Sequence, residues 1–209
     1  MQATFKLFLS CLFCFSLALV SGCGNTDGTF TGSGKSTASE KLPTLTPAEQ
    51  TEVDGFMTFG RNAALTCMQR LRDDRSMNET LALKYLKHLV SQGADVNAQG
   101  TYRYGASEYD LVTPLSVAVD RQDIELVKFL VSKGADVNAK TTAIAQATML
   151  MRAVSRENIE IIKCLVSNGA DVNAKCTWGD SPLDYAENTK NTAAAEYLKS
   201  VGAKLGSEL

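Results

Sequence analysis

The chain has 209 residues, of which 44% are hydrophobic and 21% are charged, and its formal net charge is -2. This composition is typical of a globular protein and excludes a disordered chain. The slightly acidic balance excludes the basic surface that nucleic-acid binding needs. The one histidine, His88, excludes a metal site built from several histidines, and we expect neither a metal nor another cofactor.

The first 22 residues have the pattern of a signal peptide. Lys6 is followed by an apolar run over residues 7–20, which is shorter than the about 20 apolar residues of a transmembrane helix. The run ends in Leu19-Val20-Ser21-Gly22-Cys23, which resembles the lipobox of bacterial lipoproteins. That resemblance implies that a lipid such as palmitate is attached to Cys23 and that the protein faces the periplasm. Gly24 in place of an aspartate favours the outer membrane, and a plain signal peptide with a chance cysteine is the alternative.

Residues 23–46 have the composition of a flexible linker, since they are mostly glycine and polar residues without hydrophobic periodicity. They include Gly34-Lys35-Ser36, the end of a phosphate-binding loop. Thr29 stands where that loop needs its first glycine, and a lipid anchor rather than a buried strand precedes it. The sequence therefore predicts a signal peptide (1–22), a lipidated linker (23–46) and a folded domain (47–209).

The folded part contains an internal repeat. The hexapeptide Gly-Ala-Asp-Val-Asn-Ala begins at Gly93, Gly134 and Gly169, and a worn copy begins at Gly202. A second element, Thr-Pro-Leu or a variant of it, begins at Thr113, Thr148 and Ser181, each 21 residues before the next of these glycines. The connection from each glycine to the next such element varies from 20 to 12 residues. Each repeat thus combines a block of fixed length with a variable loop, and the shortest unit is 33 residues.

The block of fixed length has the pattern of two short antiparallel helices. Thr113 is placed to cap the first helix, and Pro114 occupies its first turn, where no amide partner is lost. The second helix has matching apolar faces over residues 124–131 and 159–166. The glycine after it fits a left-handed conformation. The Asp and Asn of the hexapeptide are expected to bond the backbone of the reversing loop.

With this period and these two elements, the region from about residue 60 to 205 resembles the ankyrin-repeat family. The resemblance implies an all-α solenoid of about four helix-turn-helix repeats with short hairpin connections. The last repeat, from Ser181, is expected to be a cap. The first is degenerate, because it lacks Thr-Pro-Leu and residues 72–76 are expected to interrupt its first helix. Thr46-Pro47-Ala48-Glu49 is typical of a helix start, so we expect an extra N-terminal helix over the open end.

The resemblance also implies protein binding through the loop tips and the exposed side of the first helices. The loop before Thr113 is the longest and carries residue types that dominate interfaces, namely Tyr102, Arg103, Tyr104, Glu108, Tyr109 and Asp110. At the tip before Ser181, Trp178 beside Asp180 either anchors a partner or covers the neighbouring tip. On the first helices, Asp120, Arg121 and Arg156 align as exposed positions. The alternatives are a loop that packs on its own neighbours and helix charges that are merely solvated.

The residues that could perform chemistry do not form a catalytic set. His88 and Cys164 align with a helix-packing position, Cys67 lies on an apolar face, and Cys176 is expected to be exposed in a loop. Because no nucleophile has a base beside it, we expect neither an enzyme nor a small-molecule substrate. A lipid-anchored repeat protein resembles immunity proteins against secreted antibacterial lipases, which implies a toxic effector as the partner. The alternatives are a scaffold for a resident envelope or antioxidant enzyme and a hydrolase in the degenerate N-terminal region.

Overall fold

The computed structural model describes residues 42–73, 78–104, 108–140 and 146–209, with the backbone alone described at 71–73, 79, 101–104 and 108–111. The chain divides into two units, residues 1–40 and residues 41–209, of which the second is compact. All described residues belong to the second unit. The predicted signal peptide, Cys23 and most of the predicted linker lie outside the described residues, so the predicted boundaries at 22 and 46 stay predictions.

The second unit begins with the extra helix that the sequence predicts. Helix α2 (Pro47–Met57) starts at Thr46, whose side chain accepts a hydrogen bond from the backbone of Glu49 while Glu49 bonds back to Thr46. The helix buries Val53 and Phe56. It packs on the next two α-helices, α3 (Ala63–Asp73) and α4 (Glu79–Ser91). A single 3₁₀ turn, η1 (Gly60–Asn62), leads from α2 into α3.

The first helix pair of the array is α3 with α4. α3 includes residues 72 and 73 and ends at Asp73. Residues 74–76 lie outside the described residues, so the predicted interruption at residues 72–76 stays a prediction. His88 on α4 fits the predicted packing role, because it is half-buried and its Nε2 lies 2.5 Å from the Pro43 carbonyl oxygen.

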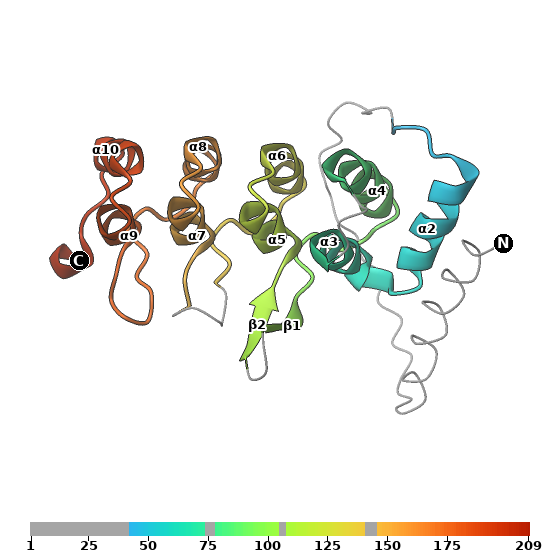
Figure 1. Cartoon of the computed structure of the whole chain (residues 1–209), viewed down its shortest axis with the longest axis horizontal. Helices are drawn as coiled ribbons and strands as arrows, with labels where there is room; N and C mark the ends of the chain where they lie inside the picture. Colours follow the sequence, from blue (N-terminus) through green and yellow to red (C-terminus); the bar gives the residue numbers. More distant parts are fainter. Residues whose placement is uncertain (1–41, 74–77, 105–107, 141–145) are drawn as a thin grey trace, which may run out of the picture. The chain divides into compact units, whose positions relative to one another are not determined.

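Three further helix pairs follow and confirm the predicted block of fixed length (Figure 1). They are α5 (Pro114–Asp120) with α6 (Ile124–Ser132), α7 (Met149–Ser155) with α8 (Ile159–Ser167), and α9 (Pro182–Asn188) with α10 (Thr192–Ser200). Each first helix is capped by the Thr or Ser that opens the repeated element. First helices pack on first helices and second on second, so α3, α5, α7 and α9 form one row and α4, α6, α8 and α10 the other. The described part of the chain is therefore the predicted all-α solenoid with one strand pair added.

That strand pair replaces the long loop before Thr113. Strands β1 (Gly100–Tyr104) and β2 (Glu108–Val112) form an antiparallel ribbon in which Gly100 pairs with Val112 and Tyr104 with Glu108. Its base is fixed to the array, since Val112 is buried with Leu65 of α3 and Ala98. Backbone pairing satisfies the amide groups that an extended insertion would leave to water.

The Asn of each hexapeptide joins one repeat to the next. The Asn138 side chain donates to the Gly169 carbonyl at 3.0 Å and accepts from the Asp171 amide at 2.8 Å. Asn97 and Asn173 make the same two bonds one repeat earlier and later. The glycines that precede these residues have φ near +90°, as at Gly134, which L side chains rarely adopt. The predicted bond within the loop is made by the Asp, as where Asp136 accepts from the Asn138 amide at 2.9 Å, whereas the bonds of the Asn side chain cross to the next repeat.

The C-terminal repeat is closed by the chain end. The Ser181 hydroxyl donates to the Lys204 carbonyl at 2.7 Å, and the Gly206 amide donates to Asp184 at 2.7 Å. A Cβ at Gly206 would lie 2.1 Å from the Gly179 carbonyl oxygen, so only glycine fits this contact. Burial acts to raise the pKa of Asp184, but the hydrogen bonds from the Ser181 amide and hydroxyl and from the Gly206 amide outweigh it and leave the pKa lowered. The segment after α10 thus packs on the start of α9, in line with the predicted cap.

Candidate functional site

One side of the array combines the first helices with the projecting connections. The β1–β2 ribbon and the connection before α9 extend away from the row of second helices (Figure 1). The described side chains that the sequence singled out on this side come from α5, α7 and the connection before α9. This side is the candidate binding surface.

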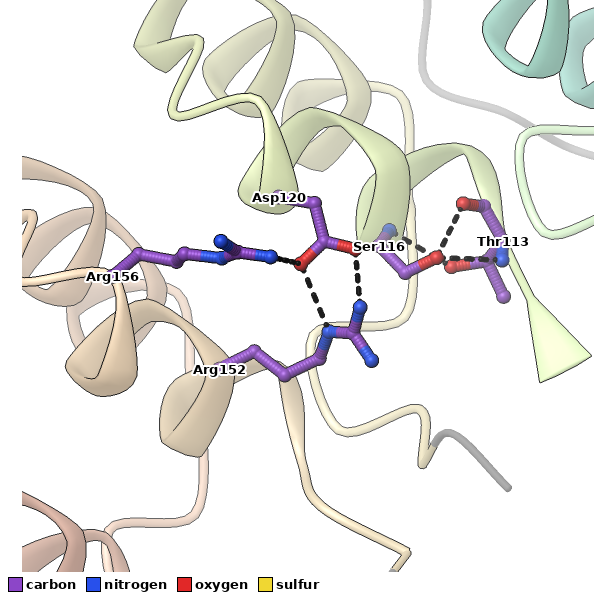
Figure 2. Close-up of polar contacts among 5 residues, drawn as sticks. All are labelled: Thr113, Ser116, Asp120, Arg152 and Arg156. Atoms are coloured by element: carbon purple, nitrogen blue, oxygen red, sulfur yellow. Dashed lines mark hydrogen bonds and ion pairs between the residues drawn. The ribbon is translucent and has the colours of Figure 1, made fainter. Parts of the chain in front are cut away.

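Two arginines of α7 and its end converge on one carboxylate of α5. Asp120, the last residue of α5, accepts from Arg152 through both carboxylate oxygens, with Arg152 Nε 3.3 Å from Oδ1. Arg156, which follows α7, brings its guanidinium to 3.4 Å from the same Oδ1. Figure 2 shows the three side chains meeting between the two helices, beside the capping pair Thr113 and Ser116. The carboxylate thus joins neighbouring repeats and holds Arg152 in place.

These contacts correct the prediction that Asp120 and Arg121 are exposed positions. Both residues are half-buried, and the Asp120 side chain is only 17% exposed. The alternative of a merely solvated charge is also wrong for Asp120, because it carries two ion pairs. Arg156 is exposed as predicted, with 49% of its side chain accessible.

A small pocket opens at this ion-pair cluster. It has a volume of about 230 Å³ and is lined by Asp120, Ala147, Arg152, Ser155, Arg156 and Tyr185. Tyr185 belongs to α9, so three successive first helices contribute to the walls. Arg152 and Tyr185 stand four residues after the opening Thr148 and Ser181, where the preceding repeat has the buried Val117. Two of the six lining residues therefore stand at one repeat position, which is apolar in the repeat that begins at Thr113.

Sequence reasoning missed Arg152 and Tyr185. The repeat alignment contained the relevant pattern, because a charged residue at a position that is apolar in the preceding repeat is unexpected in a packed core. The alignment did not reveal which residue would neutralise Arg152. Asp120 lies 32 residues earlier in the chain, and only the stacking of α5 on α7 brings it close.

The structure corrects the prediction that Cys176 is exposed. Cys176 is 6% exposed and packs with Ala147 and Met151 against Tyr185. Its position follows from the tight turn at residues 176–179, where the Gly179 amide donates to the Cys176 carbonyl at 3.0 Å. Burial raises the pKa of the Tyr185 phenol to about 12, with a smaller contribution from Cys176. Tyr185 is therefore a neutral hydroxyl donor at physiological pH.

The same turn presents the single tryptophan to solvent. Trp178 is 70% exposed, the largest exposed fraction among the exposed large hydrophobic side chains of the described residues. Residues 141–145 of the neighbouring tip lie outside the described residues, so both predicted roles of Trp178 stay predictions. Asp180, two residues later, is half-buried and accepts a backbone hydrogen bond from Cys176 at 3.0 Å. An exposed indole on a tight turn is the type of residue that anchors protein interfaces.

The ribbon residues are placed by their backbone. Tyr102 pairs with Asp110, Arg103 with Tyr109, and Tyr104 with Glu108. Their side chains lie outside the described residues, so their predicted role in binding stays a prediction.

Among the side chains that the structure describes, the cysteines are poorly suited to nucleophilic chemistry. Burial raises the pKa of Cys67 to about 12, and it also raises the pKa of the half-buried Cys164. Both thiols are therefore protonated at neutral pH, whereas the thiolate is the nucleophile. The described residues contain no group of three or more His, Cys, Asp or Glu arranged to hold a metal ion.

No helix within the described ranges has the length and apolarity that crossing a bilayer requires.

Comparison with known proteins identifies the repeats. The family described as ankyrin repeats, in three copies, matches residues 115–208. No curated protein matches the chain. The match covers the helix pairs from α5 to α10, and the stacked pairs with their hexapeptide turns agree with it. Ankyrin repeats are generally non-catalytic modules for protein–protein interaction, and residues 115–208 of this chain match that family.

Proposed function

We propose that this chain is a non-catalytic, lipid-anchored periplasmic protein that binds and inhibits a toxic effector acting in the periplasm, such as a phospholipase. The observation that carries the binding part is the exposed Trp178 in the connection before α9, which extends away from the row of second helices (Figure 1). A preformed surface suits tight capture of a folded protein, because few groups must be ordered on binding.

The proposed immunity role is argued from the lipid anchor and the linker that the sequence predicts. An anchor at Cys23 and a linker to residue 46 would hold the array where an incoming effector arrives. The described cysteines are desolvated or half-buried, which supports inhibition by occlusion of the effector rather than by chemistry.

The decisive experiment expresses a candidate effector, encoded beside this protein's gene, in the periplasm with and without this protein. We expect survival only when this protein is present. The variant Trp178→Ala should weaken protection, whereas the matched exposed-apolar variant Val201→Ala should not. Equal killing with and without the protein contradicts the immunity role. A drop in the activity of a resident envelope enzyme on deletion, with no effector present, would favour the scaffold alternative.

The lipid anchor has its own test. Cells labelled with radioactive palmitate should yield a labelled protein that fractionates with the outer membrane. Cys23→Ser should remove the label and release the protein into the periplasmic fraction. A label that persists in Cys23→Ser contradicts lipidation at this residue.

A further inference from the structure

We propose that one face of the β1–β2 ribbon receives two basic side chains, Lys or Arg, of the protein partner. This face holds Tyr102 and Tyr104 of β1 with Glu108 and Asp110 of β2, and we call it the acidic face. The inference rests on the proposed protein-binding function and names the chemistry of one contact. It is carried by the register of the strands, by the separation of charge between the two faces and by the packing at the base of the ribbon.

The strand register places these four residues together. Residues directly opposite each other in an antiparallel pair lie on the same face, and so do residues two apart along one strand. Tyr102 is opposite Asp110, and Tyr104 is opposite Glu108. All four residues therefore lie on one face, and each tyrosine is opposite a carboxylate.

The other face of the ribbon differs in charge. It holds the alternate pairs of the register, Thr101 with Leu111 and Arg103 with Tyr109. Of these four residues Arg103 alone is charged at neutral pH, and it is basic, whereas both charged residues of the acidic face are carboxylates. The ribbon thus separates its charges by face. A partner that docks on the acidic face is expected to bring positive charge to it.

A tyrosine opposite a carboxylate is suited to bind a cation. A carboxylate accepts hydrogen bonds from an ammonium or guanidinium group, and an aromatic ring attracts a cation that lies over its face. Opposite residues have Cβ atoms about 4.5–5.5 Å apart, so one basic side chain can use both groups of a pair. The two pairs are separated by two residues along the strand, or about 6.6 Å. That spacing matches basic residues two apart on a strand of the partner or one turn apart on a helix.

The base of the same face is packed against the array. Gly100 pairs with Val112, and alternation along the strands places both on the acidic face. Val112 is buried with Leu65 of α3, and a Cβ at Gly100 would lie 2.7 Å from Leu65 Cδ2. Beyond this base, β1 and β2 pack mainly on each other, and the ribbon extends away from the row of second helices (Figure 1). A strand pair with a packed base loses less conformational entropy when a partner binds than a free loop does.

The test measures binding of a basic peptide to the full chain. The probe is the capped peptide Thr-Arg-Thr-Arg-Thr, and the control peptide has citrulline in place of both arginines, which keeps the shape without the charge. Binding is followed by NMR through the tyrosine ring resonances. We expect saturable binding of the arginine peptide that weakens as salt is added, because salt screens charges that face water. The citrulline peptide should bind about ten-fold more weakly.

Charge-neutralising variants assign the binding to the acidic face. The double variant Glu108→Gln/Asp110→Asn keeps the shape of both side chains. It should weaken the arginine peptide about ten-fold, since one surface ion pair contributes about a two- to five-fold change. Glu160→Gln removes an exposed carboxylate from α8, in the row of second helices, and should leave the affinity unchanged.

The tyrosines of the ribbon distinguish its two faces. Tyr102→Ala should weaken the arginine peptide about three-fold, the change expected for one cation–π contact. Tyr109→Ala is the matched control, because Tyr109 lies on the other face of the same strand pair, and it should leave the affinity unchanged. If an alanine variant disturbs the strand pairing, the double variant of the carboxylates still decides the question.

Three results would overturn the proposal: equal affinity for the citrulline peptide, unchanged affinity in the double variant, or an equal loss in Tyr102→Ala and Tyr109→Ala. These results are separable from failure of the proposed function. If the protein protects cells but the peptide gives one of these results, only the assignment of the acidic face falls. If the peptide binds as expected but no effector is neutralised, the immunity role falls and the site for basic residues stands.

Discussion

The N-terminal part, from α2 to α4, and the repeats from Thr113 onward build similar helix pairs from different local chemistry. In the repeats, each first helix starts at a buried Thr or Ser that caps it. In the N-terminal part, α3 follows directly on η1, whose own start has no side-chain cap, and α2 packs over α3 and α4. The comparison indicates that each repeat begins its first helix with a cap from its own sequence, whereas the pair α3 and α4 depends on packing by the extra helix α2. The following predictions test that difference.

The largest effect is expected from removing the contact that α2 makes with its neighbours. Phe56 is 4% exposed, its ring lies 6.2 Å from Tyr85, and the Arg70 guanidinium lies 5.6 Å above it. Phe56→Ala should lower the free energy of unfolding by about 3–5 kcal/mol. Because repeats are stabilised mainly by their neighbours, hydrogen exchange should show lost protection in α2–α4 and retained protection in α7–α10. Uniform loss across all helices would mean that the two parts unfold as one.

The inter-repeat hydrogen bonds of the hexapeptide asparagines occur in both parts. We expect them to contribute equally to stability in each part. Asn138→Ala removes two inter-repeat hydrogen bonds, which together contribute about 1–2 kcal/mol to stability. Asn97→Ala removes the equivalent pair between α4 and the first clear repeat, so an equal cost is expected in urea denaturation. A much smaller cost for Asn97→Ala would show that the end unit is held by α2 alone.

The helix caps of the two parts differ in burial, so we expect their removal to lower the stability by different amounts. Thr113→Ala removes a buried cap and its bond to Ser116, at a cost of about 1–2 kcal/mol. Thr46→Ala removes an exposed cap of α2 and should cost about 0.5–1 kcal/mol. Thermal melts of both variants provide the measurement, and the Thr→Ser replacement at each site is the control that keeps the cap. Equal costs would contradict the dependence on burial.

The smallest effect is expected in the pH dependence of stability, to which an ion pair of the N-terminal part contributes. The hydrogen bond from Lys84 at 2.7 Å, aided by Thr46, lowers the pKa of Glu49 to about 2 from an ordinary 4.5. A carboxyl whose pKa is lowered by folding stabilises the fold above its unfolded pKa. That contribution should disappear as the pH falls from about 4.5 to about 2.

Melting temperatures at pH 7 and at acid pH test this effect. Glu49→Gln should reduce the difference between the two temperatures. Lys84→Met should reduce it too, because it removes the main cause of the lowered pKa. An acid dependence that is unchanged in both variants would show that this ion pair does not stabilise the docking of α2 on α4.

Local features of the fold were readable from the sequence. The caps at Thr46 and Thr113, the left-handed glycines and the helix pairs depend on residues within a few positions of one another, and all are confirmed. The predicted break at residues 72–76 stays a prediction, because of these residues only 72 and 73 are described, as the end of α3. The long loop was recognised as an insertion, but its strand pairing joins residues such as Gly100 and Val112, which periodicity does not relate.

The candidate site was less accessible to sequence reasoning. Arg156 was named from its place in the repeat alignment and Trp178 as the single tryptophan at a loop tip, and both are exposed. Cys176 was predicted to be exposed, but the turn at Gly179 folds it under Tyr185. Asp120 was named as an exposed position, and its partner Arg152 was missed. A contact between repeats depends on how α5 stacks on α7, which the repeat pattern implies only in outline.

The sequence by itself determined the repeat, its period and the type of fold, because short-range caps, glycines and apolar spacing define each helix pair. The tertiary structure alone decided which charges meet, which loop becomes a ribbon and where a pocket opens. The physical reason is distance along the chain. Ion pairs such as Asp120 with Arg152 join residues about one repeat apart, and only packing of successive repeats makes them neighbours.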